Sequence, residues 1–156
     1  MAKPVSVQTN SQYCLEEQVG FMLKVAGQRH STIFQLLAPF NLTLTQFCVM
    51  VKLLQIGECS QNELGRQTAT DVATIKAVIG RLRKRNLVEV KANPFDKRQF
   101  IIAPTNTAKK LEKEIYTTGK KITEQTLNPL TGTERKMLMK LLAKICCLQS
   151  NSENSS

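Results

Sequence analysis

The segment from residue 58 to residue 104 constrains the fold most, because helical spacing gives way to β-strand composition inside it. Ser60 and Glu63 stand at the spacing of a capping box, and Thr70 or Asp71 can begin a following helix. The predicted elements, in chain order, are helices over 61–67 and 71–85 and strands over 87–92 and 99–103. Two short helices followed by a hairpin are the arrangement of a winged helix-turn-helix, which predicts duplex DNA as the partner.

The helix predicted over 71–85 has two different faces. Its inward face is apolar and consists of Ile75, Val78, Ile79 and Leu82. Its outward face consists of Ala73, Lys76, Ala77, Gly80 and Lys84. Small residues beside a lysine let the backbone approach base edges, and Lys76 can reach a guanine or a phosphate. The outward face is therefore the predicted reading surface; the alternative is a surface helix with a basic end.

Residues around this helix complete the predicted DNA contacts. Thr70 and Thr74 can donate to phosphate oxygens at its N-terminus, where the helix dipole favours anions. Lys97 and Arg98 form a basic hairpin tip suited to the narrow minor groove, and Asp96 is expected to orient Arg98 or to cap the turn. The full predicted set is Ser60, Gln61, Thr70, Ala73, Thr74, Lys76, Ala77, Arg81, Lys84, Arg85, Lys97 and Arg98.

The positive charge of the chain centres on the same segment. The net charge is +10, and residues 66–98 hold nine Lys and Arg against three acidic residues. Residues 1–65 balance four basic against four acidic side chains. A basic segment is what a phosphate-binding surface requires. The further excess over 99–150 is equally well explained by solvated helix faces.

Long helices flank this segment. They are predicted over 13–38, 43–56, 105–127 and 131–148, with polar tails over 1–11 and 150–156. Residues 12–149 then form a single, mainly α domain with six helices and a small β-hairpin wing, whose DNA-binding lobe covers about 43–104. The stretch 137–148 is so apolar that it would leave an exposed patch on a monomer. We therefore expect a homodimer through helices 13–38 and 105–149, with two reading helices about 34–36 Å apart.

This order of elements, with Asp96-Lys97-Arg98 in the wing, resembles the MarR family of bacterial transcription regulators. The resemblance covers residues 13–149 and is most specific in ATDVATIKAVIGRLRKRNLV (69–88) and NPFDKRQFIIAPT (93–105). The chain departs from the family at Gly80, where a polar residue is usual, and at Pro104, where Leu commonly precedes Thr. The resemblance implies a homodimer, a palindromic operator, and release by a small ligand or by oxidation. Residues 16–34 also resemble the subgroup that regulates breakdown of aromatic or nicotinate-type acids.

Two kinds of switch are open to such a protein. His30, the only histidine, and the apolar residues Phe34, Phe47 and Met50 are candidates for binding a small aromatic carboxylate. The alternative is a structural role, which is the more common one for a lone histidine or an apolar residue on a helix. Cys14 is the candidate redox residue, because it is expected at a helix N-terminus, where a thiol becomes more acidic. A partner for it would be Cys146 or Cys147 of the other subunit; the alternative is a thiol without a role.

The sequence lacks the motifs of metal-binding, enzymatic, cofactor-binding and membrane proteins. Cys48 is expected to be buried and inert. The chain has one histidine and no C-x-x-C pair, so no metal site is expected. No phosphate-binding, dinucleotide-binding or nucleophile motif is present, so neither an enzyme nor a cofactor is expected. No apolar run is long enough to cross a membrane and no signal peptide begins the chain, which predicts a cytoplasmic protein with reduced thiols.

The predicted function is a sequence-specific repressor that a small aromatic carboxylate releases from a palindromic operator. One alternative is an oxidant-sensing repressor that uses Cys14. Another is a non-specific architectural DNA-binding protein, for which steep salt dependence and little sequence preference are expected.

Overall fold

The computed structural model describes residues 13–147, so the tails predicted over 1–11 and 150–156 lie outside the described residues. The elements are η1 (Leu15–Glu17), α1 (Val19–Leu37), η2 (Pro39–Asn41), α2 (Leu44–Ile56), β1 (Cys59–Ser60), α3 (Gln61–Gln67), α4 (Val72–Lys84), β2 (Val88–Ala92), β3 (Phe100–Pro104), α5 (Asn106–Thr126) and α6 (Gly132–Ile145). The predicted mainly α fold, with six α-helices and a small β wing, is confirmed in this part of the chain.

The helix starts follow from capping side chains. The backbone N–H three residues on donates to the side chain of each cap, and these caps are Thr43, Ser60, Asp71, Thr105 and Thr131. Thr43 with Gln46 and Thr131 with Glu134 form complete capping boxes. The capping box expected at Ser60 is only half formed, because the Glu63 carboxylate accepts instead from Arg66 and Gln67.

The first helix begins later than the sequence predicts. A single turn of 3-10 helix, η1, precedes it, and Gln18 is extended with φ −87° and ψ 128°. The α-helix therefore starts at Val19 and not near residue 13. At its other end Pro39 opens η2, where Phe40 and Asn41 adopt left-handed φ values of 55° and 53°. Both are unusual conformations for non-glycine residues and turn the chain sharply into α2.

The wing is a three-stranded antiparallel sheet in the order β1-β3-β2. Val90 of β2 and Cys59 of β1 both lie opposite Ile102 of the central strand β3. The hairpin of β2 and β3 was predicted, but β1 was not, because two residues carry no periodic pattern. Through β1 the start of α3 is hydrogen-bonded to the wing.

The core lies in the DNA-binding lobe. Its buried side chains come from α2, α3, α4 and the wing, and include Val49, Met50, Leu53, Leu64 and Ile102. The predicted inward face of α4 is confirmed, since Ile75, Val78, Ile79 and Leu82 are all buried. Dense packing on one side of α4 fixes the direction in which its other side points.

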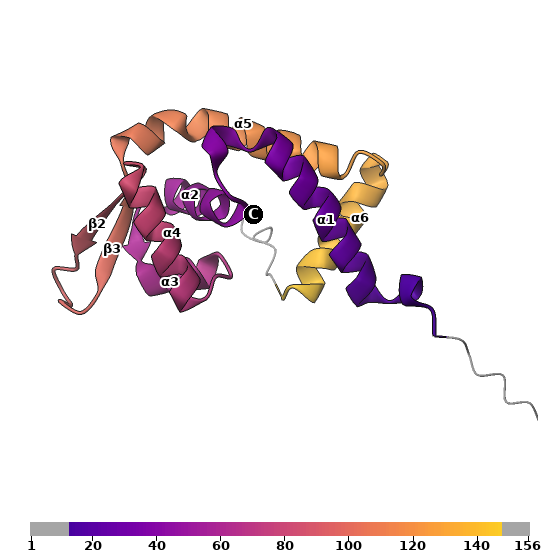
Figure 1. Ribbon diagram of the computed structural model, residues 1–156, viewed down its shortest axis with the longest axis horizontal. Helices are drawn as coiled ribbons and strands as arrows, with labels where there is room; N and C mark the ends of the chain where they lie inside the picture. The colour runs from indigo at the N-terminus through magenta and orange to yellow at the C-terminus, as the bar shows by residue number, and fades with distance from the viewer. Residues whose placement is uncertain (1–12, 148–156) are drawn as a thin grey trace, which may run out of the picture.

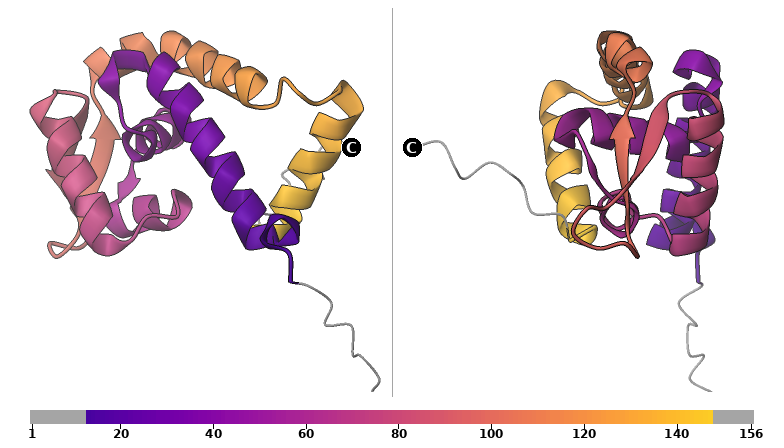
Figure 2. Two further views of the ribbon diagram at one scale, coloured as in Figure 1. Left: turned by 45° about the vertical axis from the view of Figure 1, so that its right-hand side comes forward. Right: turned by 90° about the vertical axis from the view of Figure 1, so that its left-hand side faces the viewer.

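The helix α5 connects the two ends of the molecule. Figure 1 shows α5 running from the lobe of α2, α3, α4 and the wing to the end that holds α6. It packs against both α1 and α2 on the way. The two views in Figure 2 show α1 and α6 descending from α5 outside the lobe. No helix among residues 13–147 is long and apolar enough to cross a membrane.

Candidate nucleic-acid interface and pocket

A tight turn sets α3 against α4. The amide of Thr70 donates to the carbonyl of Gly65 at 2.8 Å. A Cβ at residue 65 would lie 2.9 Å from the carbonyl oxygen of Thr70, so the turn requires glycine there. Asp71 then caps α4, and the hydroxyl of Thr74 donates to its carboxylate at 2.7 Å. Two hydrogen bonds from Thr74 lower the pKa of Asp71: the larger effect comes from the Thr74 side chain and the smaller one from its backbone amide.

The outward face of α4 is exposed over its whole length. The exposed residues on it are Ala73, Lys76, Ala77, Gly80 and Lys84, which are the residues predicted for the reading surface. Arg81 is exposed as well. Because only Lys76 and Lys84 are long on this face, the middle of the helix offers a low, smooth surface to a groove.

Four of the predicted DNA contacts have side chains that are hydrogen-bonded within the protein: Ser60 and Thr74 at the helix caps, and Arg85 and Thr70. The guanidinium of Arg85 donates to the carbonyl of Phe40, which joins the end of α4 to η2. The hydroxyl of Thr70 donates to the carbonyl of Thr68 at 3.0 Å. Arg85 is thus placed as a bridge to the start of α2, and its contact with DNA stays a prediction.

The wing tip is held by side chains that accept from the backbone. The carboxylate of Asp96 accepts from the amide of Arg98 at 3.0 Å, so the prediction that Asp96 caps the turn is confirmed. The side chain of Asn93 accepts from the amide of Phe95 at 2.9 Å. Lys97 and Arg98 are exposed. A small cavity of about 80 Å³ brings Arg98 together with the predicted contacts Ser60 and Gln61 at the start of α3.

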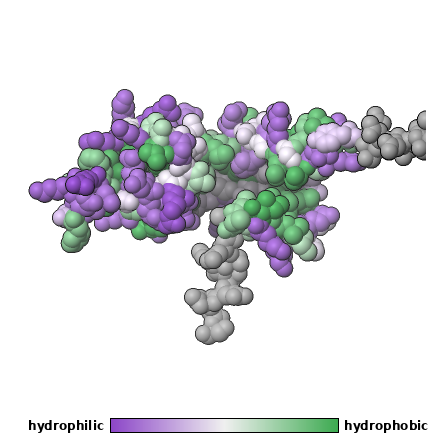
Figure 3. Space-filling view, turned by 90° about the horizontal axis from the view of Figure 1, so that it is seen from below, coloured by the Kyte–Doolittle hydropathy of each residue, from purple (hydrophilic) through white to green (hydrophobic). Residues whose placement is uncertain are grey.

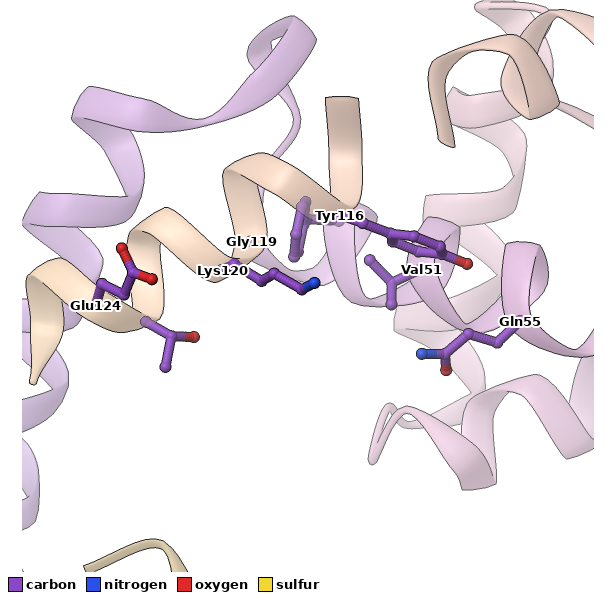
Figure 4. Close-up of a pocket in the computed structure, with 8 residues that line it drawn as sticks. Val51, Gln55, Tyr116, Gly119, Lys120 and Glu124 are labelled. Atoms are coloured by element: carbon purple, nitrogen blue, oxygen red, sulfur yellow. The ribbon is translucent and has the colours of Figure 1, made fainter. Parts of the chain in front are cut away.

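A larger pocket of about 640 Å³ lies between α2 and α5, where the lobe meets the long helix. Its lining residues are Phe47, Val51, Gln55, Tyr116, Gly119, Lys120, Thr123 and Glu124. In Figure 4 the ring of Tyr116 extends from α5 toward Val51, and the amine of Lys120 points into the space on the side of Gln55. The pKa of Tyr116 is raised, mainly by burial and further by a hydrogen bond with Glu112, so the phenol stays neutral.

The pocket depends on a close approach of two helices. A Cβ at Gly119 would lie 2.9 Å from Cζ of Phe47. The absence of a side chain at residue 119 thus lets the Phe47 ring rest against α5. The edge of that ring meets Phe34 of α1, with ring centroids 5.5 Å apart and an interplanar angle of 73°.

The four residues predicted to bind a ligand do not share one pocket. Phe47 lines the pocket between α2 and α5, whereas Phe34 lines a separate one of about 350 Å³. His30 lines an apolar pocket of about 590 Å³ between α1, α5 and α6, and its Nδ1 lies 3.0 Å from the hydroxyl of Thr126. Met50 is fully buried in the core. The rings of His30, Phe34 and Phe47 do form a continuous row, with 6.5 Å between the first two centroids.

The lining residues on α5 were missed by the sequence reasoning. Tyr116 and Lys120 stand four residues apart on a helix that was predicted only as basic and dimer-forming. One aromatic residue among many lysines at this spacing was the available signal, because residues four apart share a helix face.

The cysteines differ from expectation in two places. Cys14 precedes η1 rather than the long helix α1, and its thiol donates to the Glu16 carboxylate at 3.3 Å. Cys48 was expected to be buried, but it is exposed on α2. Within residues 13–147 no group of His, Cys, Asp and Glu side chains is placed to hold a metal ion.

Apolar side chains are exposed on α1 and α6. On these helices and on η1 they are Leu15, Val19, Met22, Leu23, Val25, Leu36, Met137, Met139, Leu141 and Ile145. In Figure 3 the hydrophobic colour gathers over the half of the molecule that holds α1 and α6, whereas hydrophilic residues dominate the lobe. An apolar surface of this kind marks a site of association.

The helices α3 and α4 form a helix-turn-helix. The exposed face of α4 carries small and basic residues, and a basic wing flanks it. Together these features define a DNA-binding regulator of the winged-helix class. The model of the MarR family matches residues 42–100. The transcriptional repressor NicR of Pseudomonas putida is 35% identical over 144 residues, which cover 92% of this chain and 91% of NicR. The chain therefore belongs to the MarR family of transcription regulators, a family of non-enzymatic proteins, and the resemblance stated from the sequence is confirmed.

Two solved structures resemble the whole domain. BpsR of Bordetella bronchiseptica, whose DNA binding is regulated by 6-hydroxynicotinic acid, has 37% identity and a TM-score of 0.81, covering 86% of this chain and 96% of BpsR. A probable transcriptional regulator of Pseudomonas aeruginosa has 38% identity and a TM-score of 0.81, covering 85% of this chain and 99% of that protein.

Proposed function

We propose that the protein is a homodimeric repressor, released from a palindromic operator when a small aromatic carboxylate binds between α2 and α5. The observation that carries this proposal is the pocket of about 640 Å³, because it lies at the junction of the DNA-binding lobe and α5. NicR is a repressor and BpsR responds to 6-hydroxynicotinic acid, which supports the same class of function here.

The lining of the pocket suits an aromatic acid. Phe47 and Val51 offer apolar walls to a ring, and Lys120 offers a cation to a carboxylate. Glu124 lies one turn farther along α5 and can accept from a ring hydroxyl or N–H group. A planar ligand with an anionic group at one end and a hydrogen-bond donor at the other would therefore match the cation of Lys120 and the carboxylate of Glu124.

The pocket has a physical route to the reading helix. Phe47 and Val51 are on α2, whose opposite face carries Val49 and Leu53 into the core shared with α4. A ligand that contacts α2 and α5 together would favour one distance between the lobe and the long helix. It can release DNA only if that distance differs from the one that the operator selects.

The exposed apolar faces of α1 and α6 support a homodimer. Both helices leave large apolar side chains uncovered, and a second copy presents the same chemistry in a two-fold arrangement. In such a dimer each α4 enters a major groove and each wing reaches the flanking minor groove. Action on operator DNA would place the protein in the cytoplasm.

The first experiment measures binding to the DNA upstream of the protein's own gene by fluorescence anisotropy, with excess non-specific DNA. We expect a specific complex that one member of a panel of aromatic and pyridine carboxylates dissociates. Lys76→Ala should weaken the complex and lower the salt slope by about one. If excess competitor DNA abolishes binding to the fragment, the result would favour the architectural alternative. If only peroxide releases the DNA, and Cys14→Ser abolishes that release, the result would favour the oxidant sensor.

A matched pair of variants tests the pocket. Lys120→Ala should keep operator affinity and lose the response to the carboxylate. Lys121→Ala removes the neighbouring exposed lysine, which is not among the lining residues, and should keep both properties. An unchanged response in Lys120→Ala would refute the proposed carboxylate partner, whereas equal losses in both variants would indicate a general charge effect.

A further inference from the structure

The wing carries an aromatic residue that the fold does not use. Phe95 is 97% exposed at the hairpin tip, a larger exposed fraction than that of any other large hydrophobic residue exposed in the described chain. No core cluster or pocket that is described above includes it. Removing an exposed aromatic ring from water is favourable, so this ring can contribute to the binding of a partner that covers the tip.

The tip holds this ring in a defined place. The side chain of Asn93 accepts from the amide of Phe95 at 2.9 Å, and the amide of Asn93 donates to the carbonyl of Gln99 at 3.1 Å. The carboxylate of Asp96 accepts from the amide of Arg98 at 3.0 Å. Because the backbone is fixed on both sides of Phe95, the ring can be inserted into a partner with little loss of chain entropy.

The position of the ring identifies the kind of partner. The helix α4 ends at the base of the wing, and the hairpin then runs back beside it (Figures 1 and 2). The tip therefore lies at the level of the N-terminal end of α4, the helix that enters the major groove in the proposed complex. Asp96 follows Phe95 and accepts from the backbone amide of Arg98, and the cations Lys97 and Arg98 come next. A surface that receives the ring must therefore also accept two cations. A DNA minor groove bordered by phosphates meets both conditions.

We propose that Phe95 is a DNA-contacting residue that enters the minor groove beside the site read by α4, as an apolar wedge against sugars and a base step. Apolar side chains inserted from a minor groove partly unstack a step, and pyrimidine–purine steps such as TA unstack most readily. The wing would thereby add a preference for flexible pyrimidine–purine steps such as TA to the preference for a narrow minor groove that Lys97 and Arg98 give it. This inference rests on the proposed function as an operator-binding protein.

The test is a selection of duplexes from a random DNA library by the full-length protein and by Phe95→Ala. We expect the wild type to enrich a palindromic centre with flexible A·T-rich steps on both flanks. Phe95→Ala should enrich the same centre but lose the preference for flexible steps in the flanks. Its affinity for the wild-type consensus should fall by about tenfold. Since Phe95 packs against nothing in the core, the variant should keep the helix content of the wild type by circular dichroism.

Lys97→Ala is the matched control at the same tip. It should weaken binding to all duplexes alike, lower the salt slope by about one and leave the selected flanks unchanged. Identical flanks selected by the wild type and by Phe95→Ala would overturn the inference and leave the operator-binding function standing. A wild type that enriches no sequence would instead overturn the proposed function, and the role of Phe95 with it.

Discussion

Gly80 is the residue at which folding and DNA binding set opposite requirements. It lies inside α4, it is exposed, and a Cβ built on it meets nothing within 4 Å. Glycine inside a helix costs roughly 0.5–1 kcal/mol relative to alanine. Gly80→Ala should therefore stabilise the protein by about that amount, which corresponds to a rise of about 2–4 °C in Tm for each kcal/mol in a chain of this size.

The same methyl group stands on the reading surface. Gly80 shares the outward face of α4 with Lys76 and Ala77, where the helix backbone must come close to base edges. A methyl group there holds the helix away from the groove, and one lost base contact costs about 1–3 kcal/mol. We therefore expect Gly80→Ala to bind the operator about tenfold more weakly or worse, although it is the more stable protein.

Thermal unfolding and operator anisotropy, measured on the same preparation at equal protein concentration, test the predicted gain in stability and the predicted loss of operator affinity. Gly65→Ala is the control, because its Cβ would lie 2.9 Å from the carbonyl oxygen of Thr70 and must displace the helix-turn-helix backbone. It should lose about 1–3 kcal/mol of stability as well as affinity. Unchanged operator affinity in a stabilised Gly80→Ala would refute the close approach of α4 to the bases. A fall in Tm would refute the helix argument.

Three further perturbations address the pocket and the helix caps. Gly119→Ala places a methyl group 2.9 Å from Cζ of Phe47 and should weaken effector binding roughly tenfold, measured by calorimetry, with operator affinity retained; an unchanged dissociation constant would remove this contact from the pocket. Thr43→Ala should lower the urea unfolding free energy by about 1 kcal/mol, and a loss below the error of the urea curves would show that its capping box is dispensable. Because the hydrogen bonds from Thr74 lower the pKa of Asp71, the stabilisation that they provide is present above the ordinary carboxyl pKa and is lost as the pH falls through the lowered value. Urea midpoints between pH 7 and pH 2 should therefore fall less steeply in Asp71→Asn than in the wild type, and parallel curves would contradict the linkage.

The local parts of the fold were predictable because their causes are local. Thr43, Thr105 and Thr131 each begin a helix within one turn of sequence, and the apolar spacing of α4 matches its buried face. The strand β1 was not predictable, since its two residues pair with β3 only after the chain has folded back across some forty positions. The break at Gln18 was missed for a related reason, because nothing in its side chain forbids a helix.

The site divides in the same way. The exposed outward face of α4 could be predicted from the spacing of its residues, as could the turn cap at Asp96, whereas the reading of DNA by that face stays a prediction. The pocket joins Phe47 of α2 to Tyr116 and Lys120 of α5, and no local pattern shows that these helices meet. The sequence reasoning grouped His30, Phe34, Phe47 and Met50 as one set of ligand-binding candidates and could not divide them among separate cavities and the core.

If the proposed effector binds in the pocket, the position of the pocket accounts for its action on DNA held by α4. Its walls belong to α2, which shares a core with α4, and to α5, which spans both ends of the molecule. The bond from Arg85 to the carbonyl of Phe40 ties the end of α4 to the turn before α2, so α2 and α4 are coupled at a second point. In the proposed dimer the two copies of α4 must lie about 34–36 Å apart to enter successive major grooves. In the proposed dimer, a ligand that fixes α2 against α5 would change the orientation of each lobe and with it that spacing. Any change that the ligand makes in operator affinity must be matched by an equal change in its own affinity when DNA is bound.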